Sequence, residues 1–278
     1  MAYEAARYAR DKTCGVVSGV TDMSTLDRAS SAARRVARTL EIRSTRWERA
    51  AHRRLFSKGN RVECPICGWS GLSFAASRKP RRLNRLCPEC KSSERDRALQ
   101  LWLMRQSARE HARLLEVAPL GLVERVAADL GFGYTSIDLQ SDRAEVRADL
   151  CDLAFADQSF DVVACFHVLE HVPADVAAAE QIARVLRSDG TAVIIVPWDR
   201  TAASTEEDFN AGPEERERRF GQSDHVRMYG RDVTDRFRAG GLEVEEVLWS
   251  DLFSPDEFRR CALDGDDDRF WLCRPAGT

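Results

Sequence analysis

Residues 114–121 read Leu-Leu-Glu-Val-Ala-Pro-Leu-Gly, an apolar run with a single acid that ends in a loop containing Pro and Gly. A short apolar run closed by a turn signal is typical of a buried strand. A helical pattern follows as far as Leu130, and the next strand candidate, at residues 134–137, ends at Asp138. This strand–helix–strand order predicts a parallel sheet with helices packed on it.

The same alternation continues toward the C-terminus. Further strands are predicted at 145–148, 160–165, 191–196, 242–249 and 269–273, and helices at about 174–186 and 230–239. A turn is expected at 188–190, and an irregular, charged insertion at about 200–222. Strands that alternate with helices of this length are typical of a doubly wound, Rossmann-like α/β sheet, which we predict over residues 112–278.

The N-terminal part of the chain differs in composition and charge. Residues 1–59 predict a basic helical segment, and residues 93–111 predict a linker helix into the α/β domain. Residues 1–113 hold 25 Lys and Arg against 11 Asp and Glu, whereas residues 114–278 hold 17 against 34. This split indicates two functional parts. The basic half either meets an anionic partner such as RNA or packs against an acidic half, of its own chain or of a second copy.

Two closely spaced cysteine pairs lie within residues 60–92. They are Cys64-Pro-Ile-Cys67 and Cys87-Pro-Glu-Cys90. Two residues between the cysteines let both sulfurs of one turn face a single ion, and two such turns complete a tetrahedral site. The sequence therefore predicts a zinc ribbon with a structural Zn²⁺, since four ligands leave no open position. A redox-active cysteine pair is the alternative.

The overall composition bears on the location of the protein. No apolar run approaches the roughly 18 residues that a bilayer-spanning helix needs, so no membrane insertion is expected. The first 12 residues lack the apolar centre of a secretory signal. The nine cysteines are odd in number, and with no export signal they favour metal binding in a reducing compartment. We expect a cytoplasmic protein.

Four motifs follow one another along the α/β domain. They are the run 114–121, Asp138 at a strand end, the segment 148–161 (Ala-Asp-Leu-Cys-Asp-Leu-Ala-Phe-Ala-Asp-Gln-Ser-Phe-Asp), and 166–172 (Phe-His-Val-Leu-Glu-His-Val). In this order and spacing they resemble the class I methyltransferases that depend on S-adenosylmethionine (SAM), of the methyltransferase type 11 kind. Combined with the cysteine pairs, the chain resembles such an enzyme with an N-terminal CPxC zinc ribbon.

The resemblance implies a SAM site at the carboxyl edge of the sheet. It places Glu116 at the methionine end of the cofactor, Asp138 at the ribose hydroxyls and Asp149 at the adenine amino group. The remaining cofactor-binding residues that it implies are Ala118, Gly121, Leu139, Leu150, Phe166 and His167. The chain departs from the family at Ala118 and Leu120, which stand where glycines are usual. Ala118 is read as a mild change, whereas Leu120 is expected to crowd the cofactor.

Candidate catalytic residues are histidines near the predicted site. His225 lies in the segment 220–230, which is dense in directed polar groups, and is a candidate base or substrate ligand. His171 belongs to the motif at 166–172, where it is expected to orient the loop. Trp198 follows Pro197 at a strand end and is a candidate pocket wall, although packing is the simpler role.

The predicted function is SAM-dependent methylation, most simply O-methylation, of a small-molecule or glycan acceptor. One alternative is an RNA methyltransferase that grips RNA with the basic half and the zinc ribbon. A second is a degenerate methyltransferase fold that acts as a binding module, because the cofactor loop is poor in glycine.

Overall fold

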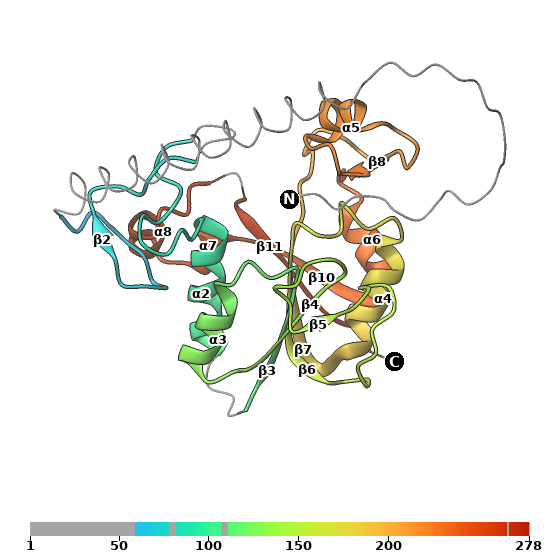
Figure 1. The fold of residues 1–278 in the computed structure, drawn as a ribbon, viewed down its shortest axis with the longest axis horizontal. Coiled ribbons are helices and arrows are strands. Elements are labelled where there is room, and N and C mark those ends of the chain that lie inside the picture. Colours follow the sequence, from blue (N-terminus) through green and yellow to red (C-terminus); the bar gives the residue numbers. More distant parts are fainter. Residues whose placement is uncertain (1–58, 78–81, 107–110, 266, 278) are drawn as a thin grey trace, which may run out of the picture.

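A computed structural model describes residues 59–77, 82–106, 111–265 and 267–277 (Figure 1). The predicted basic helical segment lies almost entirely outside these residues. None of the helices in the described part of the chain combines the length and apolar character needed to cross a bilayer.

A seven-stranded sheet forms the centre of the molecule, and its strand order is β10-β11-β7-β6-β3-β4-β5. The strands are β3 (Arg113–Val117), β4 (Gly133–Asp138), β5 (Val146–Arg147), β6 (Phe160–Phe166), β7 (Leu186–Ile195), β10 (Leu242–Leu248) and β11 (Arg269–Pro275). Strands β3 to β7 pair in parallel, whereas β11 runs antiparallel to both β7 and β10. The predicted doubly wound α/β fold is confirmed.

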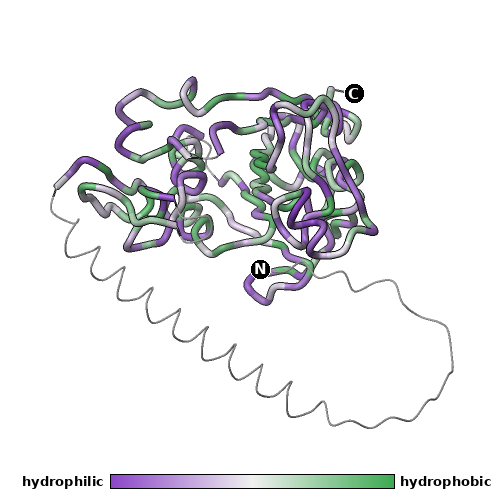
Figure 2. Tube along the Cα trace, turned by 90° about the horizontal axis from the view of Figure 1, so that it is seen from above, coloured by the Kyte–Doolittle hydropathy of each residue, from purple (hydrophilic) through white to green (hydrophobic). Residues whose placement is uncertain are grey.

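Helices cover both faces of the sheet, as Figure 1 shows. On one side lie α2 (Glu94–Gln106), α3 (Val123–Leu130), α7 (Trp249–Leu252) and α8 (Pro255–Arg260); on the other lie α4 (Asp175–Val185) and α6 (Val233–Ala239). Successive residues of a strand point to opposite faces. Accordingly, Leu114 packs in the core formed with α2 and α3, whereas Leu115 packs in a second core, formed with α4 and α6. Hydrophobic stretches run through the middle of the molecule, and hydrophilic residues prevail at its outer loops (Figure 2).

Three expectations about secondary structure were wrong. The turn at 188–190 is absorbed into β7, whose pairing with β6 is irregular between Phe160 and Val162. The insertion at 200–222 is not irregular throughout, because it contains β8 (Glu206–Glu207) and α5 (Pro213–Phe220). Helix α5 starts with a proline and ends at Gly221 with φ of 85°, and its face is charged, which hid its helical pattern. Helices α7 and α8 were also missed; they have four and six residues, too few for a periodic pattern.

The cysteine segment packs directly on the α/β domain. Its hairpin consists of β1 (Val62–Glu63) and β2 (Ser70–Gly71), and Phe74 is buried in the same core as α2. Arg97 of α2 is fully buried and donates hydrogen bonds to the carbonyl oxygens of Ser92, Cys261 and Ala262. A buried guanidinium with several carbonyl acceptors joins the ribbon, α2 and the end of α8 into one packed unit.

Candidate functional site

The carboxyl ends of β3, β4 and β6 lie at one edge of the sheet, because these strands are parallel neighbours. Glu116 lies near the end of β3 and pairs in register with Ser136 of β4. Asp138 is the last residue of β4, and its carbonyl oxygen accepts a hydrogen bond from the backbone N–H of Ala148. In open α/β sheets, ligands bind at this edge.

Glu116 is buried, with 6% of its surface exposed, and its carboxylate accepts a hydrogen bond from the Tyr134 hydroxyl at 2.5 Å. Burial raises the pKa of Glu116 to about 7, against the lowering effect of the bonds from Tyr134 and the backbone of Leu120. The other charges that most affect Glu116 are the acids Asp96 and Glu124, so its charged form gains little from a neighbouring cation. An ammonium group of a ligand would supply that cation.

The loop after β3 has an unusual backbone. Ala118 has φ of 56°, and Gly121 has φ of 81°. A left-handed conformation is costly for alanine, so the reading of Ala118 as a mild change was wrong. His167, directly after β6, has φ of 53°. Strained residues at the ends of two neighbouring strands are typical of functional edges.

A small cavity lies beneath this loop. Its volume is about 20 Å³, and Glu116, Ala118 and Phe166 share its lining with residues of α2, among them Asp96. Leu120 also lines it but is 48% exposed, so its side chain has room to turn outward. Whether Leu120 crowds a cofactor stays a prediction. The sequence analysis missed Asp96, although Ser93 and Asp96 form the Ser-x-x-Asp pattern of a helix start.

The other predicted cofactor residues lie along the same edge but outside that cavity. One carboxylate oxygen of Asp138 accepts hydrogen bonds from the backbone N–H groups of Gln140 and Ser141, each at 2.7 Å. Asp149 accepts one from the N–H of Cys151 at 2.9 Å. Leu139 follows Asp138 at the strand end, and Leu150 is buried. The structure thus aligns these residues on one edge, without joining them to Glu116 in one cavity.

A larger cleft of about 570 Å³ opens between the ribbon and the ends of β7 and β11. His167, Trp198 and His225 line it, together with arginines and acids of both parts of the chain. His167 lies between two carboxylates, with Nε2 3.2 Å from Asp267 and Nδ1 3.2 Å from Glu170. Burial acts to lower the pKa of His167, but these two acids outweigh it and raise it to about 9. His167 thus links two acids beside the cleft, and its predicted contact with the cofactor stays a prediction.

The two catalytic candidates lie side by side. The rings of His171 and His225 make an edge-to-face contact with centroids 4.7 Å apart, although 53 residues separate them in the chain. His225 is buried, and its pKa is lowered by burial against the opposing effect of Glu170. Glu170, which carries no exposed surface, faces both histidines. The sequence analysis named both histidines but missed Glu170.

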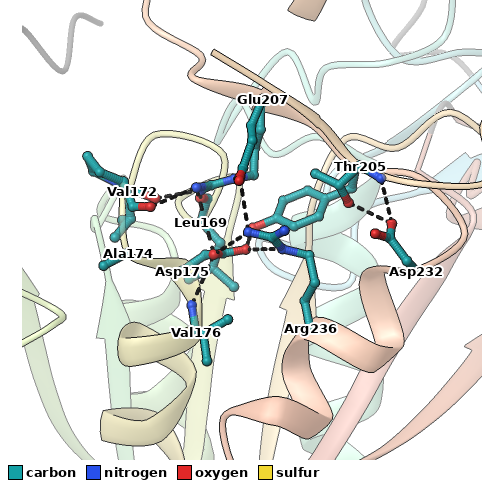
Figure 3. A network of polar contacts seen from close by, with 12 residues as sticks. Leu169, Val172, Ala174, Asp175, Val176, Thr205, Glu207, Asp232 and Arg236 are labelled. Atoms are coloured by element: carbon teal, nitrogen blue, oxygen red, sulfur yellow. Dashed lines mark hydrogen bonds and ion pairs between the residues drawn. The ribbon is translucent and has the colours of Figure 1, made fainter. Parts of the chain in front are cut away.

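A buried polar network holds these two segments together (Figure 3). Arg227 of β9 (Arg227–Met228) is fully buried and donates hydrogen bonds to the carbonyl oxygens of Leu169, Val172 and Pro173. The backbone N–H of Val226 donates to the carbonyl oxygen of Glu170 at 2.9 Å. Next to it, Asp175 accepts two hydrogen bonds from Arg236 and one from Tyr229. Because charge-assisted and buried hydrogen bonds are strong, the network sets the position of His225 against the 169–173 segment.

The four ribbon cysteines converge. The sulfur of Cys64 lies 3.6 Å from that of Cys90, and Cys67 the same distance from Cys87; all four sulfurs are within 4.8 Å of one another. Sulfurs bound to one tetrahedral zinc ion are about 3.8 Å apart, given a Zn–S distance of about 2.3 Å. Each pair ends in a left-handed residue, Gly68 or Lys91, whose N–H bonds back to the first cysteine's carbonyl. The donor set and spacing fit a structural zinc ion.

Comparison with known proteins agrees with the fold. The Methyltransf_11 family, described as a methyltransferase domain, matches residues 104–194. The matched residues run from the end of α2 to β7, so this part of the chain is similar to a methyltransferase domain. The predicted boundaries of the ribbon, linker helix and α/β domain stay predictions.

Several individual proteins are similar to parts of the chain. A demethylmenaquinone methyltransferase of Mycobacterium sp. (strain KMS) is 37% identical over 87 residues, which are 30% of this chain and 38% of that protein. The 1,6-didemethyltoxoflavin-N1-methyltransferase of Burkholderia thailandensis, solved with S-adenosylhomocysteine, covers 64% of this chain and 77% of its own at 14% identity and a TM-score of 0.42. The match to the PH0226 protein of Pyrococcus horikoshii covers 65% of this chain and 89% of that protein, at 18% identity and a TM-score of 0.43.

Proposed function

We propose that the protein is a SAM-dependent methyltransferase that methylates a hydroxyl group of a small-molecule or glycan acceptor. The observation that carries the proposal is the adjacency of two spaces at one sheet edge. Phe166 lines the small cavity with Glu116, and the next residue, His167, lines the 570 Å³ cleft. A cleft of this volume is in the range of small-molecule sites, which favours such an acceptor over an RNA strand.

The residues at the edge match the chemistry of the cofactor. Glu116 offers a buried carboxylate for its ammonium, Asp138 a carboxylate for its ribose hydroxyls, and Asp149 one for its adenine amino group. When bound, SAM supplies an electrophilic methyl group on a sulfonium. Since the cavity beneath the loop is only about 20 Å³, we expect the exposed loop around Leu120 to move outward on binding.

The acceptor side of the proposal rests on the cleft. Trp198 packs edge to face on Trp271, and the guanidinium groups of Arg200 and Arg269 lie over its ring, so it forms a stiff wall. His225 also lines the cleft, and with the adjacent His171 it would serve the acceptor hydroxyl. Positioning the acceptor against the methyl group and excluding water supply much of the expected acceleration. The ribbon contributes a wall of the cleft and, we propose, a structural Zn²⁺.

Calorimetry with S-adenosylhomocysteine on the full, zinc-loaded chain tests the cofactor part. We expect binding that Asp138→Asn weakens at least about tenfold, because hydrogen bonds to a charged group contribute about 1.5–3 kcal/mol. The exposed neighbour Asp142 supplies the control variant Asp142→Asn, which should bind normally. Absence of binding to folded protein would leave the degenerate binding module as the better reading.

The acceptor part needs a separate experiment. Labelled methyl groups from SAM are followed into a panel of sugars, phenols and bulk RNA. Transfer to a small hydroxyl compound that His225→Ala abolishes, while S-adenosylhomocysteine still binds, is the expected result. Transfer to RNA alone would overturn the proposed acceptor class in favour of an RNA methyltransferase.

A further inference from the structure

A buried carboxylate near the floor of the cleft has incomplete partners. Both oxygens of Glu170 are shielded from solvent; Oε1 has an ion pair with Nδ1 of His167 at 3.2 Å, and Oε2 has no hydrogen-bond partner among the described residues. Nε2 of His225 is likewise buried without a hydrogen-bond partner among the described residues. Such orphaned polar atoms are costly, so an unplaced ion or group is a natural explanation.

The hydrogen bonds of the two histidines fix which ring nitrogen is available. Nδ1 of His225 lies 2.8 Å from the carbonyl oxygen of Phe220, and Nδ1 of His171 lies 3.2 Å from that of Asp224. A carbonyl oxygen only accepts, so Nδ1 carries a hydrogen in both rings, and in a neutral ring Nε2 then has the lone pair. A metal-binding histidine usually donates its other N–H to a backbone carbonyl or carboxylate in this way.

The candidate ligand atoms of the three residues lie close together. Nε2 of His225 faces Oε1 of Glu170 at 3.9 Å, and one ligand atom from each of Glu170, His171 and His225 lies within 4.8 Å of the others. Two atoms bound to one cation at about 2.1 Å are about 3–4 Å apart. We propose that Glu170, His171 and His225 bind a divalent transition-metal cation near the floor of the cleft, separate from the ribbon zinc.

The donor set selects the class of cation. Two imidazoles and one carboxylate suit Zn²⁺, Fe²⁺, Co²⁺ or Ni²⁺, whereas Mg²⁺ and Ca²⁺ prefer oxygen ligands. The network around Arg227 holds His225 against the 169–173 segment, so the three ligands are in position before the ion arrives. Three protein ligands leave a coordination position open. If the proposed function is correct, that position is where an acceptor hydroxyl would be polarised.

Cobalt binding to the full chain, purified with its ribbon zinc, tests the site. We expect calorimetry and metal analysis to show about one equivalent of Co²⁺ beyond the ribbon ion, with an absorption spectrum free of thiolate charge-transfer bands. His225→Ala and Glu170→Gln should each weaken this binding at least about tenfold, as losing a ligand commonly does. The exposed His111 supplies the control His111→Ala, which should bind like the wild type.

The same Co²⁺ stoichiometry in the wild type and in a His171→Ala/His225→Ala double variant would overturn the proposal. Thermal unfolding of each variant shows whether it is folded. If one variant does not fold, the cobalt spectrum of the wild type still identifies the type of ligand. Binding of S-adenosylhomocysteine is measured in parallel. Co²⁺ binding without cofactor binding would reject the methyltransferase function alone, and the reverse result would reject the metal site alone.

Discussion

Tyr134 of β4 donates a 2.5 Å hydrogen bond to the carboxylate of Glu116 on the neighbouring strand β3, beneath the loop that is expected to hold SAM. The bond stabilises the ionised form of Glu116, but burial has the larger effect and raises its pKa to about 7. The free protein thus keeps a poorly stabilised acid where the cofactor would place an ammonium group.

This arrangement predicts a pH-dependent stability of the cofactor-free protein. The pKa of Glu116 is raised from 4.5 to about 7 on folding, so between these values the folded state binds more protons than the unfolded state. Stability is therefore lost as the pH rises through this window. We expect Glu116→Gln to be more stable than the wild type near pH 8, by up to about 3 kcal/mol, and similar to it near pH 4. Urea unfolding at both pH values measures this, and a difference that does not change with pH would contradict it.

The same substitution should cost cofactor affinity. In the wild type, S-adenosylhomocysteine should bind more tightly at about pH 7.5 than at about pH 5.5, because only the ionised carboxylate attracts the ammonium group. Glu116→Gln should bind weakly at both pH values. Calorimetry on both proteins measures the affinities, and equal pH dependence in the variant would assign the effect to another group.

The left-handed backbone at Ala118 predicts a stabilising glycine substitution. With φ of 56°, Ala118→Gly relieves strain of about 1 kcal/mol, and we expect a net gain of about 0.5–1 kcal/mol in the free energy of unfolding. Ala128→Gly, at an exposed position of α3, is the matched control and should lose about 1 kcal/mol. Chemical denaturation of the two variants should give shifts of opposite sign; shifts of the same sign would reject the strain at Ala118.

The cysteine cluster predicts a zinc ion that supports the ribbon and, through it, the cleft. Metal analysis of Cys87→Ser should show one zinc per chain fewer than the wild type, with a lower unfolding temperature, since structural zinc sites contribute directly to folding. Cys151→Ser, which lies outside the cluster, serves as the control and should keep the metal. Equal zinc content in Cys87→Ser and the wild type would contradict the prediction that the four cysteines bind zinc.

The buried Arg227 predicts a large loss on replacement. Arg227→Met leaves the carbonyl oxygens of the 169–173 segment without their donor, and we expect a loss of about 2–4 kcal/mol in the free energy of unfolding. The exposed Arg231 gives the control Arg231→Met, expected within about 0.5 kcal/mol of the wild type. Denaturant unfolding compares them, and a loss at Arg227 no larger than at Arg231 would show that the network does not hold this segment.

Local patterns in the sequence were enough to predict the sheet, because a buried parallel strand needs an apolar run. Runs such as 114–117 and 160–165 fit few other structures. They were also enough to align Glu116, Asp138 and Asp149 on one edge, since parallel strands end together. Helices α7 and α8 were not predicted, because one or two turns of helix are too short to show a periodic pattern.

Contacts between distant segments were decided by tertiary structure alone. Tyr134 reaches Glu116 through strand pairing, and Glu170 meets His225 across 54 intervening residues. The left-handed φ of Ala118 follows from the path of its loop. Pattern and spacing act over a few residues, whereas burial, pKa shifts and metal geometry depend on which side chains the packed chain brings within a few ångströms of one another. The sequence by itself determined the sheet and the residue types at its edge; only the folded chain decided which of them meet.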